Sequence, residues 1–149
     1  MLPFLKKKTF FNPAEEKQII ASIRHAEYAS SGEVRVYVES HCKKATPERA
    51  IEVFKKLKMH RTRERNGVLL YIAMEDHKFA IFGDEGIHEK MGFSFWHTES
   101  ATLKSFFAKD EIIGGLCQVI EDIGQTLKTH FPHAPDDKNE LPDKPVYGR

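Results

Sequence analysis

Apolar residues recur along this chain at two spacings, and each spacing predicts one kind of secondary structure. Steps of three and four residues predict an amphipathic helix that opens at Asn12-Pro13 and ends at Ser30-Ser31-Gly32. Asn12 suits the N-cap, and Glu15 stands at the capping-box position. Residues 33–39 alternate instead, which predicts a strand with one apolar face. That face carries Val34, Val36 and Val38.

The middle of the chain continues with a helix and a hairpin. Thr46-Pro47-Glu48 caps the second helix, and its inward positions are Ala50, Ile51, Phe54 and Leu57. Residues 67–74 are apolar throughout, so we expect a central strand that is covered on both faces. Glu75-Asp76-His77 then turns the chain into a third strand over residues 78–82. We expect these two strands to pair.

Two more helices and a tail complete the chain. Residues 95–108 predict a short helix that packs Leu103, Phe106 and Phe107. The last helix has an apolar stripe along several turns, which consists of Ile113, Leu116, Ile120, Ile123, Leu127 and Phe131. Proline and charge then dominate, so we expect residues 132–149 to be a mobile tail. Within the tail, Leu141 and Val146-Tyr147 are the residues suited to docking.

A group of aromatic residues precedes the short helix. Phe93, Phe95 and Trp96 lie in a loop that runs from Met91 to Trp96. If exposed, such a patch would be a partner-binding surface. If buried, it would fold onto the core. We expect burial, because large aromatic side chains usually supply core area.

This order of elements predicts an α/β fold. The first two strands are joined by a helix, so we expect them to be parallel with a right-handed connection. The third strand returns antiparallel to the second. A small mixed β-sheet covered by helices on both faces follows. At 149 residues, the chain is long enough for one domain with a sizeable core.

Composition narrows the classes of function. A net charge of +1 gives no general attraction to nucleic acid or to acidic membranes. Two cysteines, neither in a CxxC pair, fit a reduced compartment. The initial MLPFLKKKTFF reverses the order of a signal peptide, and the sequence contains no long apolar run. We therefore expect a cytoplasmic monomer that binds neither nucleic acid nor membrane.

Oxygen-bearing residues are expected to meet at one edge of the sheet. The predicted pairing brings Glu33 beside Asn66, together with the loop Gly83-Asp84-Glu85-Gly86. Asp110 precedes the last helix, where it is expected to act as a nearby cap. Calcium takes six to eight oxygen ligands, which such carboxylates and glycine-rich loops supply. The alternative interpretation is that these residues only end helices and strands.

The arginine and histidine side chains do not by themselves predict a binding site. Arg61, Arg63 and Arg65 could neutralise an anion. We interpret them instead as a solvated helix end, where basic residues offset the helix dipole. The chain has eight histidines, but none forms a pair at metal-ligand spacing.

Three stretches together resemble the TPM domain. They are RNGVLLYIAMEDHKFAIFGDEGIHEKMG, the preceding SGEVRVYVE and the later FFAKDEIIGGLCQVIEDIG. The family's motifs fall on Asn66 to Leu70, Gly83 to Gly86, and Phe107 to Leu116. The resemblance covers roughly residues 10–131, so we assign 1–131 to a TPM-like domain. It is closest to a stand-alone cytoplasmic version that carries a terminal N-E-L-P segment, here Asn139 to Pro142.

The resemblance implies a three-layer α/β/α sandwich, divalent-cation binding and, for some members, acid phosphatase activity. Carried to this chain, it implies a metal site made by Glu33, Asp84, Glu85 and Asp110. Asn66, Gly83 and Gly86 would be further ligand-binding residues. The expected ion is calcium, with magnesium or manganese as alternatives. One departure is Asn12-Pro13, which stands where many relatives have an aspartate-containing motif.

Two functions remain open at this point. In the first, a calcium ion orders the acidic loops of a binding module with a regulatory role and an unidentified protein partner. The alternative is a metal-dependent hydrolase of phosphate monoesters, in which Glu85 would be the general base. The sequence contains no nucleophile motif such as GxSxG, so catalytic residues cannot be assigned.

Overall fold

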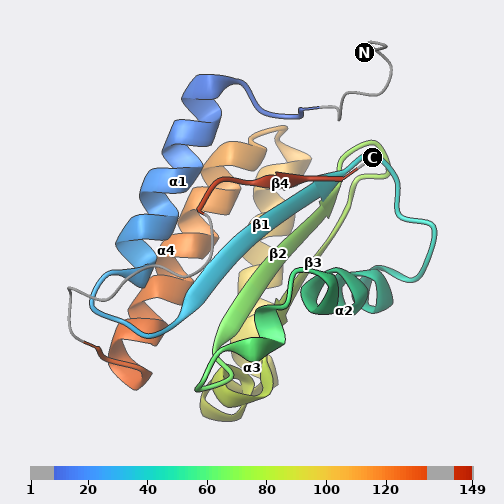
Figure 1. Cartoon of the computed structure of the whole chain (residues 1–149). Coiled ribbons are helices and arrows are strands. Elements are labelled where there is room, and N and C mark those ends of the chain that lie inside the picture. Colours follow the sequence, from blue (N-terminus) through green and yellow to red (C-terminus); the bar gives the residue numbers. More distant parts are fainter. Residues whose placement is uncertain (1–8, 134–142, 149) are drawn as a thin grey trace, which may run out of the picture.

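One mixed sheet forms the centre of the computed structural model, which describes residues 9–133 and 143–148. Its strands lie in the order β3-β2-β1-β4 (Figure 1). They are β1 (Glu33–Glu39), β2 (Gly67–Ala73), β3 (Lys78–Gly83) and β4 (Val146–Tyr147). β1 is parallel to both of its neighbours, β2 and β4, and β3 is antiparallel to β2. The predicted parallel pair and the predicted hairpin are both confirmed.

Helices cover both faces of the sheet, as expected for a three-layer α/β/α sandwich (Figure 1). The helices are α1 (Pro13–Glu27), α2 (Thr46–Lys56), α3 (Glu85–Ala108) and α4 (Ile112–His130), with a 3-10 turn η2 (Met59–Arg61). On one face, Val34, Val36 and Val38 pack under α1, α3 and α4. On the other face, Tyr37, Leu69 and Tyr71 pack under α2. Alternation along β1 thus sends its valines to the larger core.

The caps of the first two helices differ from each other. Asn12 and Glu15 form the predicted capping box, in which each backbone N–H donates to the other side chain at 2.8–2.9 Å. The second helix does not begin as predicted, because Thr46 is its first helical residue and Ala45 is the N-cap. An alanine side chain cannot accept a hydrogen bond, so α2 has no side-chain cap for its first N–H groups. Ile51, which was expected to face inward, is 38% exposed. Val53 is buried in its place.

The helix expected over residues 95–108 is in fact the second part of a longer one. α3 begins at Glu85 and is kinked at Gly92, whose backbone has φ 75° and ψ 175°. The loop expected from Met91 to Trp96 is therefore wrong, because those residues are helical on either side of the kink. Because the backbone at Gly92 is not helical, this glycine divides α3 into two helical segments, of which the second matches the predicted helix. The expected burial is wrong for Phe93, which is 81% exposed, whereas Phe95 and Trp96 are half-buried.

The end of the tail belongs to the sheet. Val146 and Tyr147 pair with Tyr37 and Val38 of β1, and the Gly148 N–H donates to the Val38 carbonyl at 2.7 Å. The buried ring of Tyr147 lies 6.0 Å from that of Phe11. The prediction of a mobile tail is therefore wrong for residues 143–148. Leu141 and the Asn139 to Pro142 segment lie outside the described residues.

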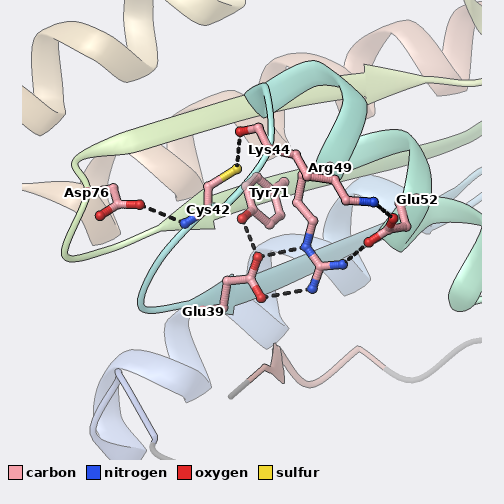
Figure 2. Close-up of polar contacts among 7 residues, drawn as sticks. All are labelled: Glu39, Cys42, Lys44, Arg49, Glu52, Tyr71 and Asp76. Carbon is pink, nitrogen blue, oxygen red and sulfur yellow. Dashed lines mark hydrogen bonds and ion pairs between the residues drawn. The ribbon is translucent and has the colours of Figure 1, made fainter.

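A polar network is buried between the end of β1 and α2 (Figure 2). Glu39 accepts hydrogen bonds from Arg49 at 2.8 and 2.9 Å and from the hydroxyl of Tyr71. Burial acts to raise the pKa of Glu39, but these hydrogen bonds outweigh it, so the pKa lies below its ordinary value. The network thus holds a buried carboxylate in its charged form.

A second buried carboxyl group lies between α3 and α4. Burial, together with the neighbouring carboxylate of Asp122, raises the pKa of Glu99 from 4.5 to about 8. Glu99 is therefore protonated in the folded protein at neutral pH but ionised in the unfolded chain. Its contribution to stability is fully present below about pH 4.5 and is lost as the pH rises through about 8.

Glu99→Gln is expected to remove this pH dependence, because glutamine keeps the shape and cannot ionise. Urea melts between pH 5 and 9 should show a free energy of unfolding that falls less steeply in the variant. The reduction is at most about 1.4 kcal/mol per pH unit, the effect of one proton. Glu89→Gln, an exposed change on the same helix, is the control and should keep the wild-type slope. An unchanged slope in Glu99→Gln would contradict the assignment.

Candidate functional site

The starts of β1 and β2 meet the end of β3 at one edge of the sheet, which we call the amino edge. Glu33 pairs with Gly67, and Val68 pairs with Gly83. The Asp84 N–H also donates to the Gly67 carbonyl at 2.9 Å. Glu33, Asn66 and the Gly83–Gly86 loop are therefore brought together, as the pairing predicts.

Asp110 is not part of the amino edge. α3 begins there at Glu85 and runs to the hairpin between β2 and β3, where the ring of Phe107 stacks on that of Phe79 at 5.8 Å. The Asp110 N–H donates to the Phe107 carbonyl, so Asp110 lies beyond that far end of the helix. The N-cap of α4 is Glu111 rather than Asp110. The expected contribution of Asp110 to the site is wrong, because α3 spans the sheet and carries the next turn to the opposite edge.

Asp84 and Glu85 lie at the amino edge, but both are engaged by Arg65. The guanidinium group donates to both Asp84 carboxylate oxygens, at 2.7 and 2.8 Å, and to Glu85 at 3.0 Å. Asp84 is also the N-cap of α3 and accepts from the Glu85 N–H at 2.8 Å. These contacts satisfy the buried Asp84 carboxylate. They match the interpretation in which this residue ends one element and begins another.

The same contacts correct the interpretation of Arg65 as a solvated helix end. Hydrogen bonding to Asp84 raises the pKa of Arg65 above its ordinary value. Its backbone carbonyl accepts from the Gly86 N–H at 2.8 Å, which satisfies one of the free N–H groups at the start of α3. A Cβ on Gly86 would overlap the Glu64 carbonyl oxygen and lie 2.7 Å from that of Arg65. Gly86 therefore permits close backbone packing.

Asn66 lies at this edge, and the hydrogen bonding of its side chain is incomplete. Its side chain is fully buried, and its Nδ2 donates to the Ser31 hydroxyl at 2.9 Å. Ser31 in turn donates to the carboxylate of Glu64. The Asn66 Oδ1 atom is buried and has no hydrogen-bond partner within the described part of the chain. A buried amide oxygen normally has a partner, so this atom is a candidate for contact with a bound water or ion.

Glu33 belongs to a cluster of charged groups around the start of β1. Burial raises the pKa of Glu27 to about 9, and the charges of Glu33 and Asp143 add to this effect. Glu27 also accepts a hydrogen bond from the Val34 N–H at 2.8 Å. Burial lowers the pKa of Arg35, against the influence of Glu33, Asp143 and Glu27. The start of β1 thus holds an excess of acidic groups.

Comparison with known proteins places this geometry in a family. The TPM domain family matches residues 5–126. The chain belongs to the TPM domain family. A comparison with curated protein sequences found no match.

Several solved structures are similar in fold to this chain, and one of them is also similar in sequence. The NMR structure of the BA42 protein from the psychrophilic bacterium Bizionia argentinensis is 39% identical to this chain. Its TM-score is 0.87, and the match covers 96% of this chain and 99% of that one. The N-terminal domain of the cg2496 protein from Corynebacterium glutamicum has 10% identity and a TM-score of 0.63, with coverages of 89% and 80%. The N-terminal domain of a P. gingivalis protein has 13% identity and a TM-score of 0.69, with coverages of 87% and 83%. The last two share the fold.

For this TPM domain, the described residues contain no group of three or more His, Cys, Asp or Glu side chains placed to hold a metal ion. Nor is any helix among them long and apolar enough to cross a membrane. Sequence reasoning missed Glu27, Glu64 and Asp143 as acidic neighbours of the amino edge. Glu64 could have been found, because it stands two residues before Asn66. Asp143 could not, because the tail sequence shows that Val146-Tyr147 are suited to docking but not where they dock.

Proposed function

We propose that this TPM domain binds a divalent cation, calcium first, at the amino edge. The oxygen atoms that would hold it are the Asn66 Oδ1 and the carboxylates of Glu33 and Glu64. The observation that carries this proposal is the buried Asn66 Oδ1 without a protein partner among the described residues. An all-oxygen set of amide and carboxylate ligands suits a hard cation such as calcium, and magnesium and manganese are the alternatives.

Asp84 and Glu85 fit this site less well than the sequence predicts. Both carboxylates are already paired with the one guanidinium group of Arg65, so a cation bound between them would have to displace that group. We therefore centre the proposed site on Asn66 and Glu33. The role that follows is a binding module, in which the cation links the start of β1 to the segment before β2. That link would shape a surface for a protein partner.

Calcium is expected to raise the melting temperature of the protein. A ligand that binds only the folded state stabilises it by about 2.7 kcal/mol at a hundredfold excess over its dissociation constant. Melting curves should be recorded with calcium, magnesium, manganese or a chelator. In Glu33→Gln, about tenfold more calcium should be needed for the same rise in melting temperature, because the variant lacks one charged ligand. Asn66→Asp should strengthen it, since it adds a negative charge while keeping the side-chain shape.

Asp110→Asn is the matched control, because it removes one carboxylate at the opposite edge of the sheet. It should respond to calcium as the wild type does. The proposal fails if calcium and chelator leave the melting temperature of the folded wild type unchanged. It also fails if Asp110→Asn and Glu33→Gln lose the calcium effect equally.

The hydrolase alternative has less support. Its expected general base, Glu85, accepts a hydrogen bond from the Arg65 guanidinium group at 3.0 Å. A general base must instead reach the proton that it removes. The same samples test the alternative: hydrolysis of p-nitrophenyl phosphate by the wild type with a cation, absent in Glu33→Gln, would revive it.

A further inference from the structure

An open pocket of about 460 Å³ lies at the opposite end of the sheet, beside the hairpin between β2 and β3. We call it the hairpin pocket. It is lined by the first turn of α2 at Thr46, by the start of β3 at Lys78 and Phe79, and by the end of α3 at Lys104 and Phe107. Small-molecule sites usually measure about 300–1,000 Å³, so this pocket is large enough for a ligand.

The charge of the hairpin pocket is positive. Lys78 and Lys104 both line it, together with His77, and none of the described lining residues is acidic. The acid whose charge interacts with Lys78 is Asp76. Its carboxylate accepts from the Cys42 N–H at 2.7 Å and bonds to His41 at 2.9 Å, and it does not line the pocket. The two ammonium groups are therefore available to an anion.

The rest of the pocket is aromatic and apolar. Phe79 and Phe107 stack with an interplanar angle of 20°, and both rings are half-buried. Such a pair offers apolar surface and ring edges to a planar group. At the rim, the first N–H groups of α2 add partial positive charge, because the Ala45 side chain cannot cap them. The pocket thus combines the positive charges of its lysines with the apolar surface of two aromatic rings.

We propose that the hairpin pocket binds small aromatic anions. The ammonium groups of Lys78 and Lys104 hold the anionic substituent, and Phe79 and Phe107 contact the ring. The anionic group is a phosphate or a carboxylate, so a nucleoside monophosphate and an aromatic acid share the required chemistry. This site is separate from the amino edge and does not depend on a bound cation.

The test is an amide NMR titration of the whole protein with two probes, AMP and benzoate. At concentrations on the order of millimolar, typical for a small ligand in an open pocket, either probe should shift the amides of residues 77–79 and 104–108. Shifts with AMP alone identify the phosphate class, and shifts with benzoate alone identify the carboxylate class. Adenosine and inorganic phosphate, each half of AMP, should bind at least tenfold more weakly.

Charge-reversing variants show whether the two lysines are responsible. Lys78→Glu and Lys104→Glu, both at exposed positions, should each weaken binding about tenfold. Lys17→Glu makes the same change of net charge on exposed α1, away from β3, and should leave binding within twofold (Figure 1). The proposal is overturned if neither probe shifts these amides, if inorganic phosphate binds as well as AMP, or if Lys17→Glu weakens binding as much as Lys104→Glu.

Discussion

Arg49→Met is expected to lower the free energy of unfolding by about 3–5 kcal/mol at pH 7. Arg49 donates two hydrogen bonds to the carboxylate of Glu39, which is buried at the end of β1 (Figure 2). Methionine fills similar space but supplies no charge, so it leaves Glu39 buried and unpaired by a cation. The measurement is urea unfolding followed by circular dichroism.

The pH dependence of this loss identifies its cause. In the wild type the pKa of Glu39 is lowered, so its contribution is present above about pH 4.5 and is lost as the pH falls through the lowered pKa. In Arg49→Met, only the Tyr71 hydroxyl and the charge of Lys56 still oppose burial, so the pKa of Glu39 should rise above its wild-type value and Glu39 should take up a proton at a higher pH. The difference between the two proteins should therefore shrink between pH 7 and pH 4.

Two further variants control for the loss of a side chain. Lys44→Met breaks an exposed ion pair with Glu52 and should lower the free energy of unfolding far less than Arg49→Met does. Adding Glu39→Gln to Arg49→Met removes the uncompensated charge and should restore part of the stability. Equal losses in Lys44→Met and Arg49→Met would contradict the assigned role of the buried pair.

Gly86→Ala is expected to lower the free energy of unfolding by about 3 kcal/mol, at the upper end for overpacking. The added Cβ would overlap the Glu64 carbonyl oxygen and crowd that of Arg65. Backbone atoms move less readily than a side-chain end, so the start of α3 must shift. The same urea experiment measures the loss.

Gly114→Ala is the matched control for Gly86→Ala. Gly114 is exposed near the start of α4, and a Cβ there would lie 3.4 Å from the Phe106 ring, an ordinary contact. Alanine favours a helix over glycine by up to about 1 kcal/mol, so this variant should be as stable as the wild type or more so. If Gly86→Ala were equally stable but lost calcium binding, Gly86 would be a ligand-binding residue, as the sequence predicts, and the packing role would be wrong.

The order and pairing of the main elements could be predicted from the sequence because local periodicity determines them. The pattern of apolar residues shows how each element is buried. It indicates one core face for the valines of β1, two covered faces for β2 and one buried stripe for α4. The crossover between β1 and β2 then requires a parallel pair. β4 escaped this reasoning, because two residues are too few to show a period.

The candidate site was predicted only in part, since spacing along the chain does not reveal ion pairs or helix length. The strand register correctly places Glu33, Asn66 and Asp84 at one edge. Gly92 concealed the first part of α3, and the shorter helix misplaced Asp110. Arg65 adjoins the predicted edge in sequence, but only the geometry shows that its guanidinium group holds Asp84.

A calcium titration followed residue by residue in amide NMR spectra tests the proposed cation site most directly. We predict concentration-dependent shifts at residues 31–33 and 64–67, with the side-chain amide of Asn66 among the most affected. The amides around Asp110 should remain unchanged. Shifts confined to Asp110 or to Asp84 and Glu85, or no shifts anywhere, would contradict a site centred on Asn66 and Glu33.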